Sequence, residues 1–269
     1  MEPVVSIVTV SFNAEQCIGI TIESVLAQTY TDYEYVFIDG KSSDKTVDII
    51  ESYRAAFEKK GIRYYVLSEK DAGIYDAMNK GISKACGKWV QMLNAGDSFA
   101  DENVLKDVFS ACDASSDVLY GDTIIQDGEY YKIIKAGDLE SMKRDMPMCH
   151  QSVFVKRSLL AEYGFDTSYR LAADYNQLLR AYLEGKCFQY VHKLIAVYDT
   201  SGESEKNFQK TIAEQNAIRK SYGIECVDLT KRTLFLRARA RLIKRIIPGV
   251  SRSQARGWYR TLNDVKKQY

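Results

Sequence analysis

The stretch VVSIVTVSFN, residues 4–13, decides how the rest of the chain is interpreted. Its first nine residues are nearly all apolar or β-branched, with no regular alternation of polar and apolar positions. Such a run is typical of a strand buried on both faces, as the strands of a parallel sheet are. Asn13 follows the strand and is a candidate cap for a helix that extends through about residue 28.

Strand and helix patterns alternate from this stretch to residue 121. Further strands are expected at residues 35–38, 62–67, 89–93 and 117–120, and helices at residues 42–59, 74–85 and 102–112. Repeated β-α order predicts an α/β fold whose mainly parallel central sheet is flanked by helices on both faces.

The pattern changes after Gly121. We expect a hairpin of residues 123–126 and 130–135 around Asp127-Gly128, further strands at 152–155, 188–191 and 195–198, and a helix at 174–183. From about residue 203 the chain is expected to be helical. We divide it into a domain of residues 1–228, with halves at 1–121 and 122–228, and a C-terminal helical extension of residues 229–269.

Composition indicates an ordinary globular protein, with 46% hydrophobic and 27% charged residues. The six cysteines form no CxxC pair, which favours free thiols in a reducing compartment. The N-terminus enters a strand pattern directly, so no signal peptide is expected, and no apolar run is long enough to span a bilayer. We therefore expect a cytoplasmic protein.

Basic residues are concentrated at the C-terminal end. Residues 230–269 hold 12 lysines and arginines and one acid, whereas the rest of the chain holds 25 basic and 35 acidic residues. Leucines and isoleucines are interleaved with these charges, which is typical of an amphipathic helix on an anionic membrane surface. Packing of this basic tail on the domain or on a second subunit is the main alternative. Nucleic acid binding has no other support in the sequence.

Polar residues follow three of the predicted strands, at Thr9–Asn13, Asp39 and Asn94–Asp97. Because ligands bind beyond the carboxyl ends of strands in an open parallel sheet, these residues are candidates for one site. Each has a plain structural alternative, as a helix cap or a turn. A dinucleotide-binding dehydrogenase is disfavoured because no glycine precedes Gly19 after the first strand, and a Walker loop is absent.

Four motifs give the chain a recognisable resemblance. They are residues 5–13 (VSIVTVSFN), 38–46 (IDGKSSDKT), 71–82 (DAGIYDAMNKGI) and 93–97 (LNAGD). In this order and spacing they resemble a family 2 glycosyltransferase of the kind that builds bacterial surface polysaccharides. The resemblance extends over about residues 4–200. It implies the GT-A fold, which binds a nucleotide-diphospho-sugar donor.

The resemblance also implies roles for donor-binding residues. Thr9 and Asn13 would lie beside the nucleotide, and Asp39 would accept a hydrogen bond from the base N3–H, which suits uracil or thymine. Asp76 and Asn79 belong to a segment that would wall the ribose and diphosphate. Many relatives carry an arginine where Met78 stands, and Lys80 or Lys41 is a candidate substitute.

The metal motif of the family is thinned in this chain. Asn94 takes the first acidic position of Asp-x-Asp, Gly96 the second, and Asp97 follows. The resemblance then implies Mn²⁺ or Mg²⁺ at Asp97, with Asn94 as a donor contact and the diphosphate and water completing the shell. His150 is a further candidate, as a metal ligand or an acceptor contact. Its alternative is a structural histidine at a strand entry.

The catalytic base of the family is usually written Glu-Asp, and here it corresponds to Ala173-Asp174. Asp174 would take the proton of an acceptor hydroxyl in an inverting displacement. An acid that merely stabilises a helix start is the alternative role, and Asp166 is the weaker candidate base. The acceptor would be a glycan or a lipid-linked sugar. A sugar nucleotidyltransferase and a non-catalytic binding module are the competing functions.

Overall fold

The computed structural model describes residues 2–127, 130–199 and 207–226. Nine strands form one sheet in the order β3-β2-β1-β4-β8-β6-β9-β5, with β7 paired to β6. The strands are β1 (Val5–Ser11), β2 (Tyr33–Asp39), β3 (Tyr64–Ser68), β4 (Trp89–Met92), β5 (Ser98–Phe99), β6 (Val118–Asp127), β7 (Tyr130–Ile134), β8 (Val153–Lys156) and β9 (Phe188–Asp199). Strands β3, β2, β1 and β4 are parallel, so the predicted mostly parallel α/β sheet is confirmed.

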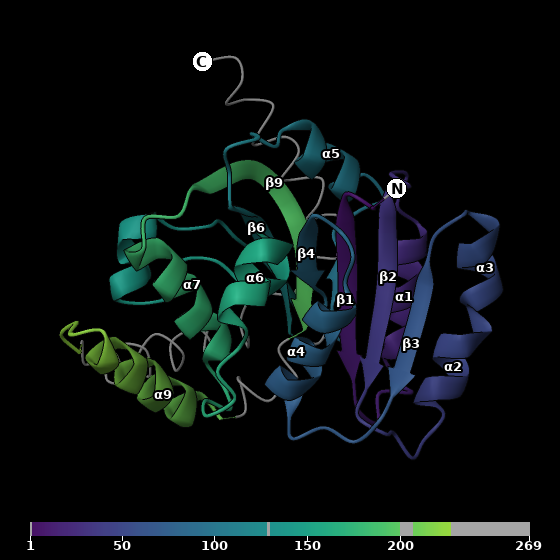
Figure 1. Cartoon of the computed structure of the whole chain (residues 1–269), viewed down its shortest axis with the longest axis horizontal. Coiled ribbons are helices and arrows are strands. Elements are labelled where there is room, and N and C mark those ends of the chain that lie inside the picture. The colour runs from purple at the N-terminus through teal and green to yellow at the C-terminus, as the bar shows by residue number, and fades with distance from the viewer. Residues whose placement is uncertain (1, 128–129, 200–206, 227–269) are drawn as a thin grey trace.

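Helices cover both faces of this sheet (Figure 1). One face packs against α1 (Ile18–Leu26), α2 (Thr46–Ser52), α3 (Arg54–Lys59) and α5 (Val104–Ser110). The other packs against α4 (Ile74–Lys84), α6 (Arg157–Tyr163), α7 (Ala173–Leu183) and α9 (Phe208–Ser221). Two 3₁₀ turns, η1 (Leu139–Lys143) and η2 (His150–Ser152), precede β8.

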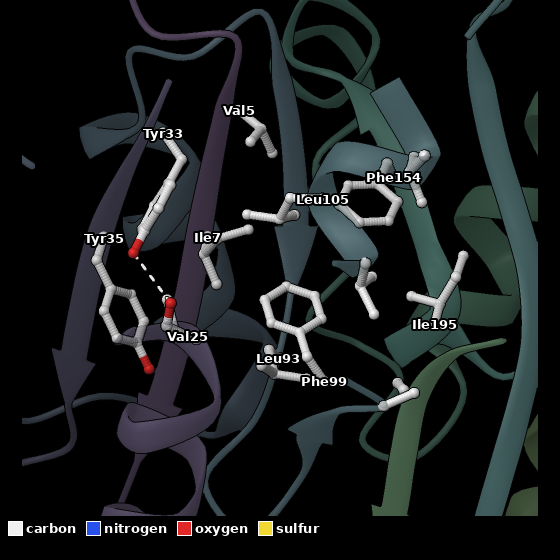
Figure 2. Close-up of a cluster of buried hydrophobic side chains, with 14 of the residues drawn as sticks. Val5, Ile7, Val25, Tyr33, Tyr35, Leu93, Phe99, Leu105, Phe154 and Ile195 are labelled. Carbon is white, nitrogen blue, oxygen red and sulfur yellow. Dashed lines mark hydrogen bonds between the residues drawn. The ribbon is translucent and has the colours of Figure 1, made fainter. Parts of the chain in front are cut away.

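Burial on both faces explains the unbroken apolar pattern of β1. Its odd-numbered residues, Val5 and Ile7, join the cluster shown in Figure 2, and Val8 and Val10 join the cluster on the opposite face. In the Figure 2 cluster, the buried hydroxyl of Tyr33 donates to the carbonyl of Val25 at 3.0 Å, which ties β2 to α1. The aromatic residues of β2 therefore fill the core without leaving a buried hydroxyl unpaired.

Several predicted boundaries were wrong, and non-local pairing explains them. The strand expected at 117–120 and the first arm of the hairpin are one continuous strand, β6. Likewise β9 is a single strand through 188–199, interrupted in its pairing with β6 where His192 adopts a φ of 51°. The helix expected at 42–59 is two short helices, α2 and α3, which meet at Tyr53.

The expectation that Asn13 caps the next helix was also wrong. Helix α1 begins at Ile18 after Cys17, and no side chain caps it. Asn13 has a φ of 47°, in the left-handed region that asparagine tolerates better than most residues. The chain therefore turns sharply after β1 and needs four more residues before the helix starts.

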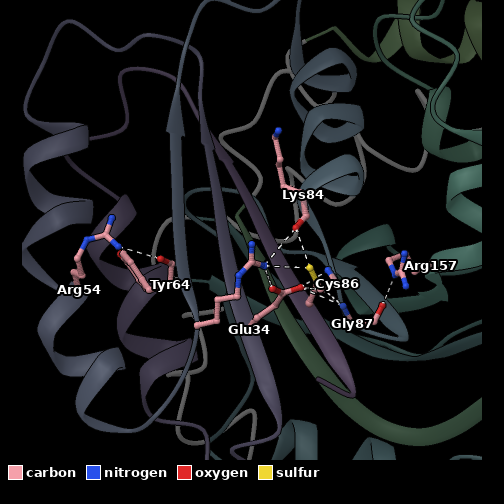
Figure 3. Close-up of polar contacts among 9 residues, drawn as sticks. Glu34, Arg54, Tyr64, Lys84, Cys86, Gly87 and Arg157 are labelled. Atoms are coloured by element: carbon pink, nitrogen blue, oxygen red, sulfur yellow. Dashed lines mark hydrogen bonds and ion pairs between the residues drawn. The ribbon is translucent and has the colours of Figure 1, made fainter. Parts of the chain in front are cut away.

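A buried carboxylate organises the amino ends of the strands. Glu34 of β2 is fully buried, and its Oε1 accepts hydrogen bonds from Ser6 Oγ at 2.5 Å and from Gly87 N at 3.1 Å. Arg63 pairs with its other oxygen. Figure 3 shows Glu34 beside Cys86 and Gly87. The partners of Glu34 come from β1, from the residue before β3 and from the loop before β4, so this network holds the amino ends of these strands together.

Strand β8 runs antiparallel to its neighbours β4 and β6. Because β8 enters the sheet from the edge at which β4 ends, η2 and the turn after β4 become neighbours.

Six free cysteines are present, as expected for reduced thiols. The described residues contain no helix long and apolar enough to cross a membrane. The predicted basic tail falls outside the described residues.

Candidate active site

The candidate site lies at the carboxyl ends of the parallel strands. Strands β1, β2 and β3 end in register at Ser11, Asp39 and Ser68. The turn of residues 94–97 follows β4, and α7 begins close to it. This edge therefore gathers most of the residues that the sequence singled out, from segments as far apart in the chain as β1 and α7.

Asp39 is fully buried and accepts four hydrogen bonds from the protein. Its Oδ1 accepts from Ser11 Oγ at 3.1 Å and Ser42 Oγ at 2.5 Å, and its Oδ2 accepts from Ser42 N at 2.9 Å and Ser68 Oγ at 2.7 Å. Three serine hydroxyls from three segments thus hold the carboxylate in place. Hydroxyls can rotate, so a base N–H would compete with them for the carboxylate oxygens.

Thr9 and Asn13 flank this carboxylate in different ways. The Thr9 hydroxyl is buried and donates to Leu93 O at 2.7 Å, so it links β1 to the residue that follows β4. Asn13 is exposed, and its Oδ1 accepts from Ser43 N at 2.9 Å. Asn13 is therefore open to a ligand, whereas Thr9 supports the strand ends. Their contacts with a nucleotide stay predictions.

The segment of residues 71–79 approaches the end of β2 closely at Gly40. A Cβ added there would lie 2.6 Å from Asp71 Oδ2, so a larger residue at position 40 would displace the Asp71 side chain. Asp76 Oδ2 in turn accepts from Ala72 N at 3.0 Å and lies 3.5 Å from Lys80 Nζ.

Two residues of this segment are engaged inside the protein. Asn79 Nδ2 donates to Phe165 O at 2.9 Å, and its Oδ1 accepts from Phe165 N at 2.8 Å, so the side chain clamps the loop after α6. Lys80 Nζ pairs with Glu69 at 2.9 Å and donates to Lys70 O at 2.8 Å. Both side chains therefore have hydrogen-bond partners within the protein.

The turn after β4 is shaped by Gly96. Its φ of 97° lies in the region that favours glycine, and Asp97 N closes the turn on Asn94 O at 3.0 Å. Asp97 is only 4% exposed; its Oδ1 accepts from Asp199 N at 3.1 Å and its Oδ2 from Gln151 Nε2 at 3.2 Å. The turn therefore presents Asp97 inward.

His150 joins this turn to Asp174. Its Nε2 lies 3.3 Å from Asn94 Nδ2, and its Nδ1 lies 3.2 Å from Asp174 Oδ2. Tyr75 of α4 donates to the other oxygen, Oδ1, at 2.9 Å. One imidazole ring thus connects Asp174, the predicted base, to the turn of residues 94–97, which is predicted to bind the sugar donor.

The pKa values within this group follow from burial and pairing. Burial raises the pKa of Asp174, but hydrogen bonds from His150 and Tyr75 and the charge of His150 outweigh it and lower that pKa overall. Burial lowers the pKa of His150, yet the hydrogen bond with Asp174 and the charges of Asp174 and Asp97 leave it raised. Burial raises the pKa of Asp97 to about 7.

A small cavity of about 20 Å³ lies behind Asp174, bordered by His150, Gln177 and apolar residues of β4, β8 and α6. Its size suits a single water molecule. The buried Nε2 of Gln177 has no protein partner among the described residues. The apolar residues that line this cavity limit the access of solvent to that side of Asp174.

The residues at the turn suit a divalent ion only in part. Among residues 2–127, 130–199 and 207–226, no three His, Cys, Asp or Glu side chains gather as a metal site. Asp97 offers a carboxylate, and the buried Oδ1 of Asn94 is an acceptor without a donor in the described protein. These oxygen atoms fit a hard cation that takes its remaining ligands from a diphosphate and water.

Sequence reasoning missed Tyr75, Gln151 and Asp199 as neighbours of the site. Tyr75 lies within a motif that the resemblance quoted, but nothing local indicates that its hydroxyl reaches Asp174. Gln151 follows His150, and Asp199 ends β9 beside Asp97. Only the tertiary structure brings these three side chains to the candidate site at the carboxyl ends of the strands.

A comparison with known families gives the class of the protein, a glycosyltransferase with the GT-A fold. The family model described as glycosyl transferase family 2 matches residues 6–163. The chain belongs to glycosyltransferase family 2.

Curated relatives agree with this assignment. The chain is 31% identical over 204 residues to a PGL/p-HBAD biosynthesis glycosyltransferase of Mycobacterium bovis, an alignment that covers 74% of this chain and 78% of the relative. It is 27% identical over 209 residues to the amylovoran biosynthesis glycosyltransferase AmsB of Erwinia amylovora, covering 72% of this chain and 68% of the relative. The family match and these relatives together show that the chain is a glycosyltransferase.

Solved structures share the fold at low sequence identity. S. aureus TarS 1–349 in complex with UDP-GlcNAc superposes with a TM-score of 0.62 at 20% identity, covering 80% of this chain and 66% of that one. The Pyrobaculum calidifontis mannosyltransferase PcManGT, in complex with GDP-Man and Mn²⁺, gives 0.64 at 17% identity, covering 83% and 65%. The chain thus spans slightly less than two thirds of these structures.

Proposed function

We propose that the protein is an inverting, metal-dependent glycosyltransferase that moves a sugar from a UDP-sugar, or secondarily a dTDP-sugar, to a hydroxyl of a glycan or lipid-linked acceptor. The observation that carries this proposal is the hydrogen-bonded connection from Asn94 through His150 to Asp174. It sets a donor turn beside a buried carboxylate at the edge where open parallel sheets bind ligands.

The proposed reaction is a single displacement. Asp174 accepts the proton of the acceptor hydroxyl while the oxygen attacks the anomeric carbon, and the bond from that carbon to the diphosphate breaks. His150 and Tyr75 hold the two oxygens of Asp174, so the carboxylate is ionised and oriented before the acceptor arrives. Because His150 and Tyr75 already hold Asp174, its carboxylate does not have to be reoriented when the acceptor binds.

The donor is proposed to lie along the ends of β1, β2 and β4. Asp39 accepts from the uracil or thymine N3–H, and Asn13, Asp76, Asn94 and Asp97 are the proposed binding residues for the ribose and diphosphate. Mn²⁺ or Mg²⁺ held at Asp97, with Asn94 beside it, supplies positive charge for the departing diphosphate. Thr9 and Asn79 act on this site through the backbone that they hold, and His150 through Asp174.

A donor panel tests this function. The full chain is incubated with Mn²⁺ and each of several UDP-, dTDP- and GDP-sugars, and released nucleoside diphosphate is measured. We expect slow hydrolysis of one UDP- or dTDP-sugar that EDTA abolishes. If no donor is turned over and calorimetry detects no nucleotide binding, the chain is a non-catalytic module instead. Preference for a GDP-sugar would contradict the role of Asp39.

A second part of the proposal places the protein at the cytoplasmic face of the plasma membrane through its basic tail, residues 230–269. Twelve basic residues among leucines and isoleucines favour an anionic lipid surface. The full chain should sediment with vesicles containing phosphatidylserine and should be released by salt, whereas a chain ending at residue 229 should stay in solution. Equal partition of the two chains would contradict this part.

A further inference from the structure

Helix α9 is attached to the beginning of α7 by an unusual set of contacts. The Glu214 carboxylate accepts hydrogen bonds from three successive backbone amides, Arg170 N at 3.1 Å, Leu171 N at 2.7 Å and Ala172 N at 3.1 Å. These amides lead directly into α7, whose first turn carries Asp174. Glu214 lies beyond residues 6–163, the part of the chain that the family model matches.

Helix α7 has no cap of its own. Ala172 occupies the N-cap position, and no side chain there accepts from the first turn. The three amides that Glu214 holds precede the first helical residue, Ala173, and a negative charge at this end interacts well with the helix dipole. Glu214 supplies that charge from a helix about 40 residues further along the chain.

Two further residues, Arg219 of α9 and Tyr222 just after it, hold this helix against Arg144 and the first turn of α7. Arg219 is fully buried and donates to Arg144 O at 2.7 Å, with its guanidinium 3.4 Å from the Tyr175 hydroxyl. Tyr222 donates to Asn176 Oδ1 at 3.1 Å. Residues of α9 thus contact the chain before Asp174 and the two residues after it. Because the backbone is held on both sides of Asp174, its side chain has little freedom to move.

We propose that Glu214 is a positioning residue: by holding the three amides that lead into α7, it fixes the direction in which Asp174 meets the acceptor hydroxyl. The inference rests on the proposed role of Asp174 as the base. It gives α9 a part in catalysis without contact with the substrate. A misplacement of about 1 Å at a reacting group can reduce a rate by about two orders of magnitude.

The test compares Glu214→Gln and Glu214→Ala with Glu225→Gln, a control at an exposed acid near the end of α9. Glutamine keeps one acceptor oxygen but turns an NH₂ group toward the amides, so it should reproduce much of the defect. In the Glu214 variants, kcat for transfer should fall about 10- to 100-fold with donor KM unchanged. Glu225→Gln should behave as the unaltered chain.

Two readouts follow the position of Asp174 without any substrate. The protein has two histidines, so the ring resonances of His150, which contacts Asp174, are readily assigned by NMR. The amide of Asn176 closes the first turn of α7 on Ala172 O at 3.0 Å, and its hydrogen exchange reports on that turn. Both should change in the Glu214 variants, while exchange in the sheet stays as in the unaltered chain.

The outcomes separate this inference from the proposed function. If the unaltered chain turns over no donor, the proposed function fails, and the NMR and exchange results still decide whether Glu214 controls the turn. Unchanged His150 resonances and Asn176 exchange in both Glu214 variants would overturn the inference. Faster exchange spread evenly over the whole fold, with kcat preserved, would show a purely structural cap and would also overturn it.

Discussion

His150 Nδ1 lies 3.2 Å from Asp174 Oδ2, and this contact joins a 3₁₀ turn before β8 to the first turn of α7. The imidazole and the carboxylate each favour the charged form of the other, which leaves the pKa of His150 raised and that of Asp174 lowered. Asp174 is therefore ionised at neutral pH, as a base must be before it can accept a proton.

Replacing Asp174 tests this assignment directly. Asp174→Asn keeps the shape of the side chain and removes the proton acceptor, so transfer should fall by about 10²- to 10⁴-fold while nucleotide affinity is retained. Transfer rate and calorimetric nucleotide affinity are measured together. Asp166→Asn is the matched control, because Asp166 is exposed and accepts from Ser168 N in a turn. Full activity in Asp174→Asn would transfer the role of base elsewhere.

The raised pKa of His150 predicts a pH dependence of stability. A histidine whose pKa is raised on folding stabilises the protein fully below its unfolded pKa of about 6.5 and loses this contribution as pH rises through the folded value. Denaturant unfolding of the protein should therefore show a decline in the free energy of unfolding above about pH 6.5. His150→Gln should lack this part of the decline.

The control for this measurement is the other histidine. His192 is exposed and has a left-handed φ of 51°, so His192→Asn suits its backbone and should keep the pH dependence of the unaltered chain. The same decline in His150→Gln as in the unaltered chain would assign the slope to another group.

Asp97 is expected to reduce the stability of the metal-free protein while it serves donor binding. Burial raises its pKa to about 7, so in the metal-free protein the ionised carboxylate costs folding free energy that grows as pH rises from about 4 to 7. Asp97→Asn should therefore be more stable than the unaltered chain at pH 8, by about 1 kcal/mol or more. It should also lose Mn²⁺-dependent donor binding. A less stable variant with intact donor binding would contradict both roles.

Much of the fold could be predicted because its signals are local. The apolar run of β1 and the alternation of strands and helices are patterns within short stretches of the chain. The continuous strand β6 and the antiparallel entry of β8 could not be predicted, since both depend on which distant strands pair. The turn at Asn13 misled the prediction, because asparagine suits a helix cap and a left-handed residue equally.

The candidate site divides in the same way. Residue types at strand ends indicated Asp39 and Asp97, and the family resemblance indicated Asp174. Sequence could not reveal that Asn79 and Lys80 face internal partners, nor that Glu214 caps α7 from outside. The contacts of Asn79 and Glu214 exist only after α4, α6, α7 and α9 have packed together, whereas Lys80 pairs with residues of the loop before α4. None of these contacts leaves a periodic pattern in the chain.

Asn79 offers a test of that division. Its amide makes two hydrogen bonds with the backbone of Phe165, so Asn79→Ala should lower the free energy of unfolding by about 2 kcal/mol through the unpaired N–H and C=O. Donor KM should stay close to that of the unaltered chain, because both ends of the amide are engaged with the backbone of Phe165. Asp76→Asn is the control and should raise donor KM with little loss of stability. If Asn79→Ala instead raises donor KM at unchanged stability, its amide leaves Phe165 to bind the donor, as the family resemblance implied.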